Sequence, residues 1–268
     1  TMALLDYTRR AMLAAGTATA IALSAISVTA QTPDDVLVVG QIAEPKALDP
    51  AAVTAVNDFR ILMNLYDGLV RYKDGTLEVE PALATSWNIN NDGTEYTFSL
   101  RQGVKFHDGS DFNADAVKFN FDRMLDEAHP YHNTGPFPLS FFFSAIVSVD
   151  VLDPMTVKFT LNAPYAPFLS NLAYPTGLIV SPDAVAKHGT DFGRNPSGTG
   201  AFKFGEWRSN EAVVVEANSS HWEGAPKLQA VVFRPITDAN TRTAEMLAGG
   251  IDMMVEVPPV ALSKFQGD

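Results

Sequence analysis

The sequence predicts an α/β protein, and two alternating runs with one amphipathic run between them indicate this class. Over residues 94–100, apolar and polar side chains alternate strictly, as in a strand with one buried and one solvated face. Residues 155–161 repeat this pattern, so we expect the two strands to be neighbours in one sheet. Between them, Asn113 is placed to cap a helix whose apolar residues recur at helical spacing.

The segment before the helix predicts three further elements. Residues 36–42 form a short apolar strand. Asn57 or Asp58 is placed to cap the helix that follows, because a short polar side chain can accept a hydrogen bond from the first helical N–H groups. Val104 and Phe106 predict a short strand after the first alternating run.

After the helix, residues 128–143 are rich in proline and aromatic side chains. The prolines exclude a regular helix at the start of this stretch, because each removes a backbone donor. The three phenylalanines at 141–143 are expected in the core. Residues 212–217 and 228–236 predict two strands, and the next helix is expected to end at Gly249.

Composition excludes several classes of function. The formal net charge is −12 and no basic residues cluster, which argues against a nucleic-acid partner. The chain has no cysteine, which excludes disulfides, thiolate metal sites and cysteine nucleophiles. No serine lies in a nucleophile-elbow pattern and the carboxylates form no recognisable acid/base pair, so we predict no catalytic residue and no enzyme activity.

Two local patterns allow both a functional and a purely structural interpretation. His129 and His132 have a spacing that binds metals on a helix, but Pro130 lies between them and no third ligand follows, which favours a solvated loop. The glycines at 195–202 resemble a phosphate-binding loop, but the lysine of such a loop is missing, so they are expected to serve tight turns. We therefore predict no metal site and no cofactor.

The first thirty residues have the composition of an export signal. Arg9 and Arg10 precede an apolar or small run over 11–28, and residues 28–30 offer a small-residue cleavage site. The paired arginines leave a general secretory route and a twin-arginine route open. A membrane anchor is disfavoured because small and hydroxyl side chains dilute the run. We expect an exported protein.

One long block carries a resemblance to a known family. Its residues are Trp87, Asp92-Gly93, Tyr96-Thr97-Phe98, Leu100-Arg101, the run GVKFHDG at 103–109, Phe112, Ala114-Asp115 and Arg123. In this order they resemble the signature block of the family 5 extracellular solute-binding proteins, which are the peptide, nickel and opine receptors of ABC importers. Shorter matches agree: YDGLV at 66–70, NPSGTGAF at 195–202, and residues 218–252.

The resemblance implies a periplasmic binding protein-like fold of class II, cluster C type, in which a mixed-sheet lobe carries an inserted α+β subdomain. The implied boundaries are a signal peptide at 1–30, a main lobe at 31–65 and 175–256, an inserted subdomain at 66–174, and the start of a second lobe at 257–268. Members of the family are roughly twice this long, so the second lobe is expected to be largely missing.

The resemblance also implies where a ligand binds. The loop after the LDP motif, a Pro-Tyr pair and the residues after an Ile-Asp pair border the ligand in relatives. Carried to this sequence, the ligand-binding residues are Thr54, Ala55, Val56, Tyr131, Met254, Val255 and Glu256. For the first three, the alternative is that the loop only caps the following helix.

The expected function is capture of oligopeptides or dipeptides by closure of two lobes about a hinge, with delivery to an ABC permease at the inner membrane. The protein is expected to be a monomer whose partners are a short peptide or similar small solute and the permease subunits, and not a nucleic acid. Two alternatives stay open. One is a receptor of the same family for nickel, haem, or an opine or sugar conjugate, and the other is an exported hydrolase.

Overall fold

The computed structural model of the chain describes residues 33–265. The predicted signal peptide and its cleavage site lie outside the described residues. The described residues form one compact unit. Among the described residues, no helix combines the length and the apolar character needed to cross a membrane.

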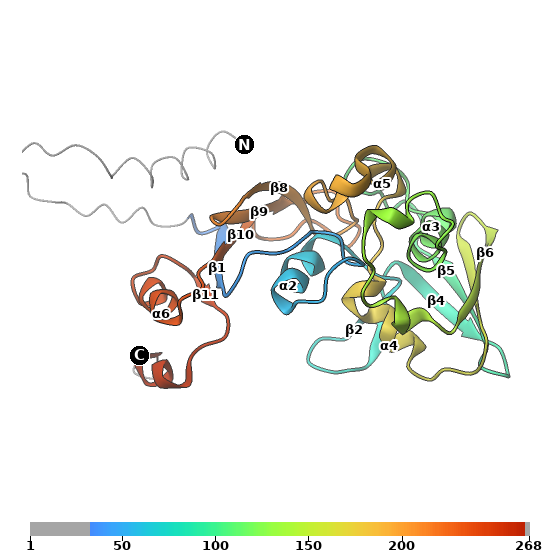
Figure 1. The fold of residues 1–268 in the computed structure, drawn as a ribbon, viewed down its shortest axis with the longest axis horizontal. Coiled ribbons are helices and arrows are strands. Elements are labelled where there is room, and N and C mark those ends of the chain that lie inside the picture. Colours follow the sequence, from blue (N-terminus) through green and yellow to red (C-terminus); the bar gives the residue numbers. More distant parts are fainter. Residues whose placement is uncertain (1–32, 266–268) are drawn as a thin grey trace, which may run out of the picture. The chain divides into compact units, whose positions relative to one another are not determined.

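Five strands form a mixed sheet, drawn at one end of this unit in Figure 1. They are β1 (Val36–Gln41), β8 (Phe202–Arg208), β9 (Ala212–Ala217), β10 (Ala230–Pro235) and β11 (Met253–Met254), in the order β11-β1-β10-β9-β8. β1 runs parallel to both β10 and β11, whereas β9 is antiparallel to β10 and β8 to β9. The predicted mixed sheet is therefore confirmed.

A second, antiparallel sheet has the order β4-β5-β7-β6. Its strands are β4 (Ala84–Ile89), β5 (Glu95–Leu100), β6 (Ile146–Asp153) and β7 (Thr156–Leu161). β5 pairs directly with β7, which confirms that the two alternating runs are neighbours. Tyr96, Phe98 and Leu100 are buried, as the alternation requires. A small hairpin of β2 (Val70–Tyr72) and β3 (Val79–Pro81) precedes this sheet.

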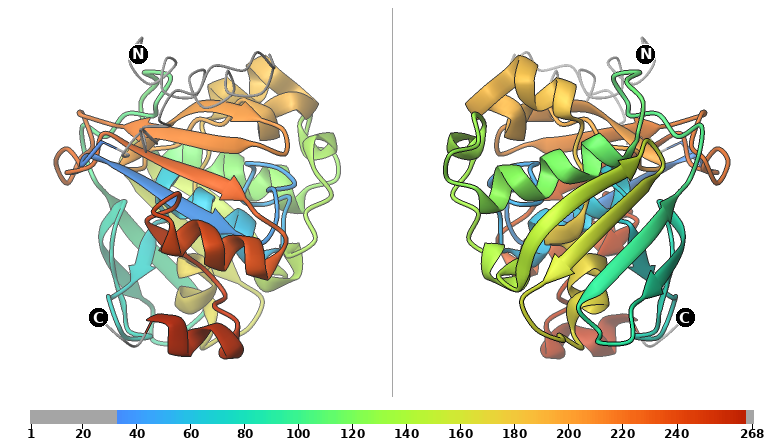
Figure 2. Two further views of the ribbon diagram at one scale, coloured as in Figure 1. Left: turned by 90° about the vertical axis from the view of Figure 1, so that its left-hand side faces the viewer. Right: turned by 90° about the vertical axis from the view of Figure 1, so that its right-hand side faces the viewer.

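Helices cover both sheets. They are α2 (Val56–Leu65), α3 (Ala114–Leu125), α4 (Phe168–Ala173), α5 (Pro182–His188), α6 (Ala239–Leu247) and α7 (Leu262–Phe265). α3 lies against β6 and β7, as the right-hand view of Figure 2 shows. α2 buries Ile61, Leu62 and Leu65 against one face of the five-stranded sheet. α6 lies on the other face of that sheet, where Arg234 of β10 pairs with Glu245 at 3.0 Å.

The apolar core has two parts. One lies between α3, α4 and the four-stranded sheet and contains a chain of edge-to-face aromatic contacts through Phe98, Phe159, Phe121 and Phe143. The other lies between α2 and the five-stranded sheet. The domain boundaries named above stay a prediction, although each sheet has a core of its own.

Helix capping agrees with the prediction at α3 and differs at α2. The Asn113 side chain accepts a hydrogen bond from the Ala116 N–H at 2.9 Å, so Asn113 caps α3 as predicted. The prediction that Asn57 or Asp58 caps α2 is wrong. α2 starts at Val56, its N-cap residue is Ala55, and no side chain caps it. Asp58 is fully buried inside the first turn and accepts from the Lys46 N–H instead.

Three further predictions are corrected. Val104 and Phe106 are buried but form no strand, because only an isolated bridge joins Lys105 to Asp111 between the turns. Of the phenylalanines at 141–143, Phe143 is fully buried whereas Phe141 is 60% exposed, because the segment is a 3-10 helix with one outward face.

The glycines of the 195–202 segment serve close approach and not tight turns. A Cβ atom on Gly198 would lie 2.2 Å from the Leu65 carbonyl oxygen, and one on Gly200 would lie 2.4 Å from that of Asn64. Backbone at the end of α2 therefore leaves room only for glycine at these positions.

Candidate ligand-binding site

The parallel strands of the mixed sheet place their carboxyl ends at one edge. β1 ends at Gln41, β10 at Pro235 and β11 at Met254, and all three run in the same direction. In open α/β sheets, ligands bind outside the carboxyl ends of the strands. We call this region the carboxyl edge, defined by Gln41, Pro235 and Met254 together with the start of α2.

The first three predicted ligand residues lie in the connection from β1 to α2. Thr54 is exposed, Ala55 is the N-cap residue of α2, and Val56 is 60% exposed although it begins the helix. The Val56 side chain is therefore accessible to another molecule. The capping alternative is weakened, because no side chain of this loop caps α2.

The last three predicted residues, 254–256, lie at the end of β11 and directly after it, beside β1. Met254 pairs with Gly40, and the Val255 N–H donates to the Gly40 carbonyl at 3.1 Å. Glu256 has a φ of 56°, in the left-handed region that is costly for a residue with a side chain. Residues in such conformations concentrate at ligand sites and switch regions.

One ion pair brings these two groups of predicted residues together. Arg60, one turn into α2, places Nη2 3.5 Å from Oε1 of Glu256. Their side chains are 27% and 48% exposed, so the pair is partly open to solvent at the carboxyl edge, whereas Nη1 of Arg60 is buried and has no hydrogen-bond partner among the described residues. Residues 54–56 and 254–256 therefore border the same region, from opposite sides.

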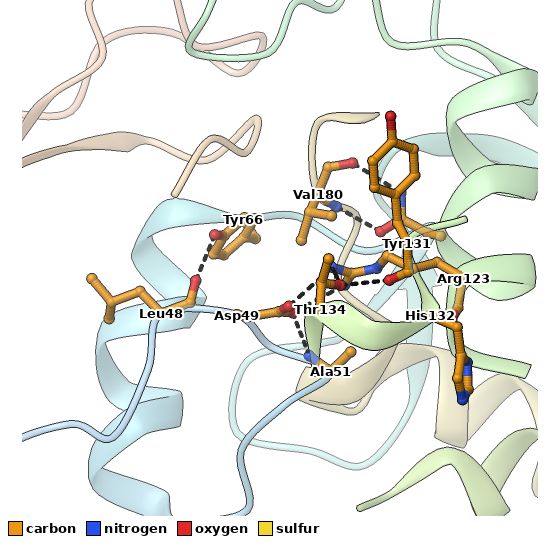
Figure 3. Close-up of polar contacts among 10 residues, drawn as sticks. Leu48, Asp49, Ala51, Tyr66, Arg123, Tyr131, His132, Thr134 and Val180 are labelled. Carbon is orange, nitrogen blue, oxygen red and sulfur yellow. Dashed lines mark hydrogen bonds and ion pairs between the residues drawn. The ribbon is translucent and has the colours of Figure 1, made fainter. Parts of the chain in front are cut away.

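The Tyr131 ring has a different set of neighbours. Its ring packs against Phe119 at 5.7 Å and His129 at 5.9 Å between ring centroids, and it is half-buried. In Figure 3 its side chain points away from the ion pair between Asp49 and Arg123. The backbone of Tyr131 is nevertheless connected to the loop that carries Thr54, through that ion pair.

Two residues of the carboxyl edge carry no sequence prediction. Gln41 ends β1 fully buried, and neither polar atom of its side chain has a hydrogen-bond partner among the described residues. Buried amides nearly always have partners, so Gln41 is a candidate for polar contact with a ligand or water. Arg60 is the other. The available sequence signal for Gln41 was a polar residue near the end of an apolar strand, whereas no sequence signal marked Arg60.

A mostly buried carboxylate, that of Asp67, forms a separate polar junction. Asp67 Oδ2 accepts from Thr199 Oγ1 at 2.8 Å and Trp222 Nε1 at 3.0 Å, and His221 Nε2 lies 3.6 Å away. Burial acts to raise the pKa of Asp67, but His221, Trp222 and Thr199 together outweigh it and hold the pKa below its ordinary value. This site is closed by its own partners and is structural.

His107 forms a second polar junction. Nε2 lies 3.0 Å from the Gly200 carbonyl, and the Gly198 N–H donates to Nδ1 at 3.3 Å. These partners fit the neutral ring with its proton on Nε2. Burial lowers the pKa of His107 to about 4. Among residues 33–265, no group of three or more His, Cys, Asp or Glu side chains has the arrangement of a metal site.

Comparison with known proteins decides the family. Residues 78–268 match the model of the bacterial extracellular solute-binding proteins, family 5. The chain belongs to this family. Its members are solute-binding proteins of transport systems and not enzymes, which confirms the predicted absence of catalysis.

Relatives and solved structures agree with this assignment. The chain is 35% identical to the glutathione-binding protein GsiB of Pectobacterium atrosepticum, over 96% of this chain and 48% of GsiB. It is similar to DppA of Helicobacter pylori, solved with the peptide STSA, with a TM-score of 0.80 and 36% identity over 85% of this chain and 48% of DppA. It is also similar to NikZ of Campylobacter jejuni, solved with Ni(L-His), with a TM-score of 0.79 and 30% identity over 88% and 46%.

These similarities confirm a periplasmic binding protein fold with a mixed sheet. The chain spans about half the length of the relatives that it matches. Proteins of this fold hold ligands as different as a peptide and a nickel complex, so the fold alone does not select the ligand.

Proposed function

We propose that the chain forms one lobe of a periplasmic solute-binding protein that captures short peptides and delivers them to an ABC permease. The observation that carries the proposal is the carboxyl edge, where the exposed start of α2 and the residues after β11 border one region and present Arg60 and Glu256 to solvent. A short peptide carries an ammonium and a carboxylate group, and the edge presents one charge of each sign.

Similarity to peptide binders supports this ligand class. GsiB is named for glutathione, which is a tripeptide, and DppA was solved with a tetrapeptide. In the proposed mechanism, a second lobe closes over the peptide about a hinge and the permease recognises the closed form. The seven predicted ligand residues form the wall contributed by this lobe, and export to the periplasm uses the predicted signal segment.

Native mass spectrometry of the full-length mature protein, purified gently from the periplasm, tests the ligand class. We expect bound masses that correspond to glutathione or to a family of short peptides. A single discrete mass of a metal complex or of an opine or sugar conjugate would contradict the proposal. If the protein is purified empty, calorimetry with glutathione and with Ser-Thr-Ser-Ala follows, and binding of neither contradicts the proposal as well.

The proposed contact of Tyr131 has a sharper test. Y131F keeps the ring that packs on Phe119 and removes only the hydroxyl group. If the hydroxyl donates to the peptide, affinity falls about 2- to 10-fold, which corresponds to one neutral hydrogen bond. F141A is a matched control, because Phe141 is an exposed aromatic residue of the same proline-rich stretch. Equal effects of the two substitutions would remove Tyr131 from the site.

A further inference from the structure

A buried ion pair joins two loops that the proposed site uses. Arg123 of α3 donates from Nη1 to Asp49 Oδ2 at 3.0 Å and from Nη2 to Asp49 Oδ1 at 3.1 Å (Figure 3). The two side chains are 1% and 3% exposed. The bidentate geometry fixes the position of the carboxylate as well as its distance from the guanidinium group.

On one side, Asp49 shapes the loop that leads to Thr54. Its Oδ1 atom accepts from the Ala51 N–H at 3.0 Å, and its carbonyl oxygen accepts from the Ala52 N–H at 3.1 Å. The preceding residue is held as well, because the Tyr66 hydroxyl donates to the Leu48 carbonyl at 2.7 Å. The direction in which the chain leaves residue 52 toward α2 therefore depends on the position of Asp49.

On the other side, Arg123 holds the loop that carries Tyr131. Its Nη1 atom donates to Thr134 Oγ1 at 3.3 Å, and that hydroxyl donates to the Tyr131 carbonyl at 2.7 Å. The Arg123 carbonyl lies 3.0 Å from Nδ1 of His132. One arginine thus contacts the loop through its side chain and through its backbone.

The two loops also touch directly. A Cβ atom on Gly135 would lie 3.2 Å from the Cβ atom of Ala52, so the Ala52 side chain packs closely against the backbone of Gly135. Movement of either loop requires the other to move or the ion pair to break.

We propose that Asp49 and Arg123 are positioning residues that couple the loop at 51–56 to the loop at 131–134, so that both present their ligand residues in one geometry. The role of this coupling in ligand binding rests on the proposed function, whereas the coupling between the two loops does not. A merely structural pair would lower global stability without a specific effect of one loop on the other.

Amide hydrogen exchange followed by mass spectrometry on the full-length protein tests the coupling without any ligand. D49N keeps the size of the side chain and the acceptor for the Ala51 N–H but removes the charge, and its effect is measured in the 131–134 loop. R123K keeps the charge but cannot form the two parallel hydrogen bonds, and its effect is measured at 51–52. The effect of each substitution is therefore measured in the loop that the substituted residue does not contact directly.

N120A is the matched control. Asn120 lies on α3, is buried, and hydrogen-bonds the backbone of Val180 in both directions at 2.9 Å, but has no recorded hydrogen bond to either loop. We expect D49N to speed exchange in the 131–134 loop, and R123K to speed it at 51–52, by about tenfold or more, since a hydrogen bond to a charged group is worth about 1.5–3 kcal/mol. N120A is expected to leave the exchange rates of both loops unchanged even where it lowers thermal stability as much as D49N or R123K does.

The proposal would be overturned by unchanged exchange at 131–134 in D49N and at 51–52 in R123K, or by equal acceleration of exchange in N120A. Calorimetry with glutathione and Ser-Thr-Ser-Ala on the same variants adds the link to binding, where affinity is expected to fall together with loop protection. If exchange responds as expected but no variant and no wild-type protein binds a peptide, the coupling stands and the proposed function fails.

Discussion

Two arginine–carboxylate pairs of this chain have the same chemistry in opposite surroundings. Arg123 and Asp49 are almost fully buried and form two hydrogen bonds near 3.0 Å, whereas the side chains of Arg60 and Glu256 are 27% and 48% exposed and meet at 3.5 Å. The buried pair can hold its loops in place, because neither side chain can exchange its hydrogen bonds for bonds to water. The exposed pair can exchange its partner for a ligand at small cost. The comparison separates residues that position the proposed site from residues that are free to contact a ligand.

The largest expected effect comes from breaking the buried pair. D49A leaves the Arg123 charge buried without its partner and is expected to lower the free energy of unfolding by about 3–5 kcal/mol. The double variant D49L/R123M, which removes both charges, is expected to recover most of that loss. Urea unfolding of the three proteins measures both values. A cost of D49A below about 1 kcal/mol would make the buried pair equivalent to a surface pair and would end the distinction.

A contrast between interior strands and edge strands explains which parts of the fold could be predicted. β1, β5, β7, β9 and β10 were predicted, because each is an interior strand with a face buried against the apolar core and therefore has a clear hydrophobic pattern. β4, β6, β8 and β11 were not predicted, and all four are edge strands. An edge strand is partly solvated on both faces, as the mostly exposed β4 shows, so its alternation is weak.

The site divides in a similar way. The family resemblance supplied seven ligand residues, and the structure brings 54–56 and 254–256 to one edge, although their contact with a ligand stays a prediction. The pair of Asp49 and Arg123 could not be predicted, because 74 residues separate its members and neither lies in a pattern that marks burial. The cap at α2 was predicted wrongly because Asp58 prefers a tertiary hydrogen bond to Lys46 over a local one.

His107 extends the comparison to a buried junction that has no ion pair. Its pKa is about 4 in the folded protein and 6.5 ordinarily, so between these values the unfolded chain binds more protons than the folded one. Stability is therefore fully present above pH 6.5 and falls as the pH is lowered toward 4, by about 3 kcal/mol at most. Protonation places a second proton on Nδ1, which faces the Gly198 N–H.

The variant H107Q tests this account, because glutamine keeps one donor and one acceptor but does not titrate in this range. Urea unfolding from about pH 4.5 to 7 is expected to show a flatter decline of stability in H107Q than in the wild type. Parallel profiles of the two proteins would mean that His107 is not the source of the acid sensitivity.

The smallest expected effect belongs to the exposed pair at the carboxyl edge. A double-mutant cycle with R60A and E256A is expected to give a coupling free energy of about 0.2–1 kcal/mol, since both side chains are partly solvated and entropy opposes their ordering. The coupling is expected to vanish at about 1 M salt, where the screening length falls to about 3 Å. The buried pair is expected to keep its coupling under the same conditions, because water and salt do not reach it. A coupling between Arg60 and Glu256 that exceeds about 2 kcal/mol, or that resists salt, would show that the edge is as tightly ordered as the buried junction. Glu256 would then be held in its left-handed conformation by Arg60, and the pair would position the site in place of contacting the ligand.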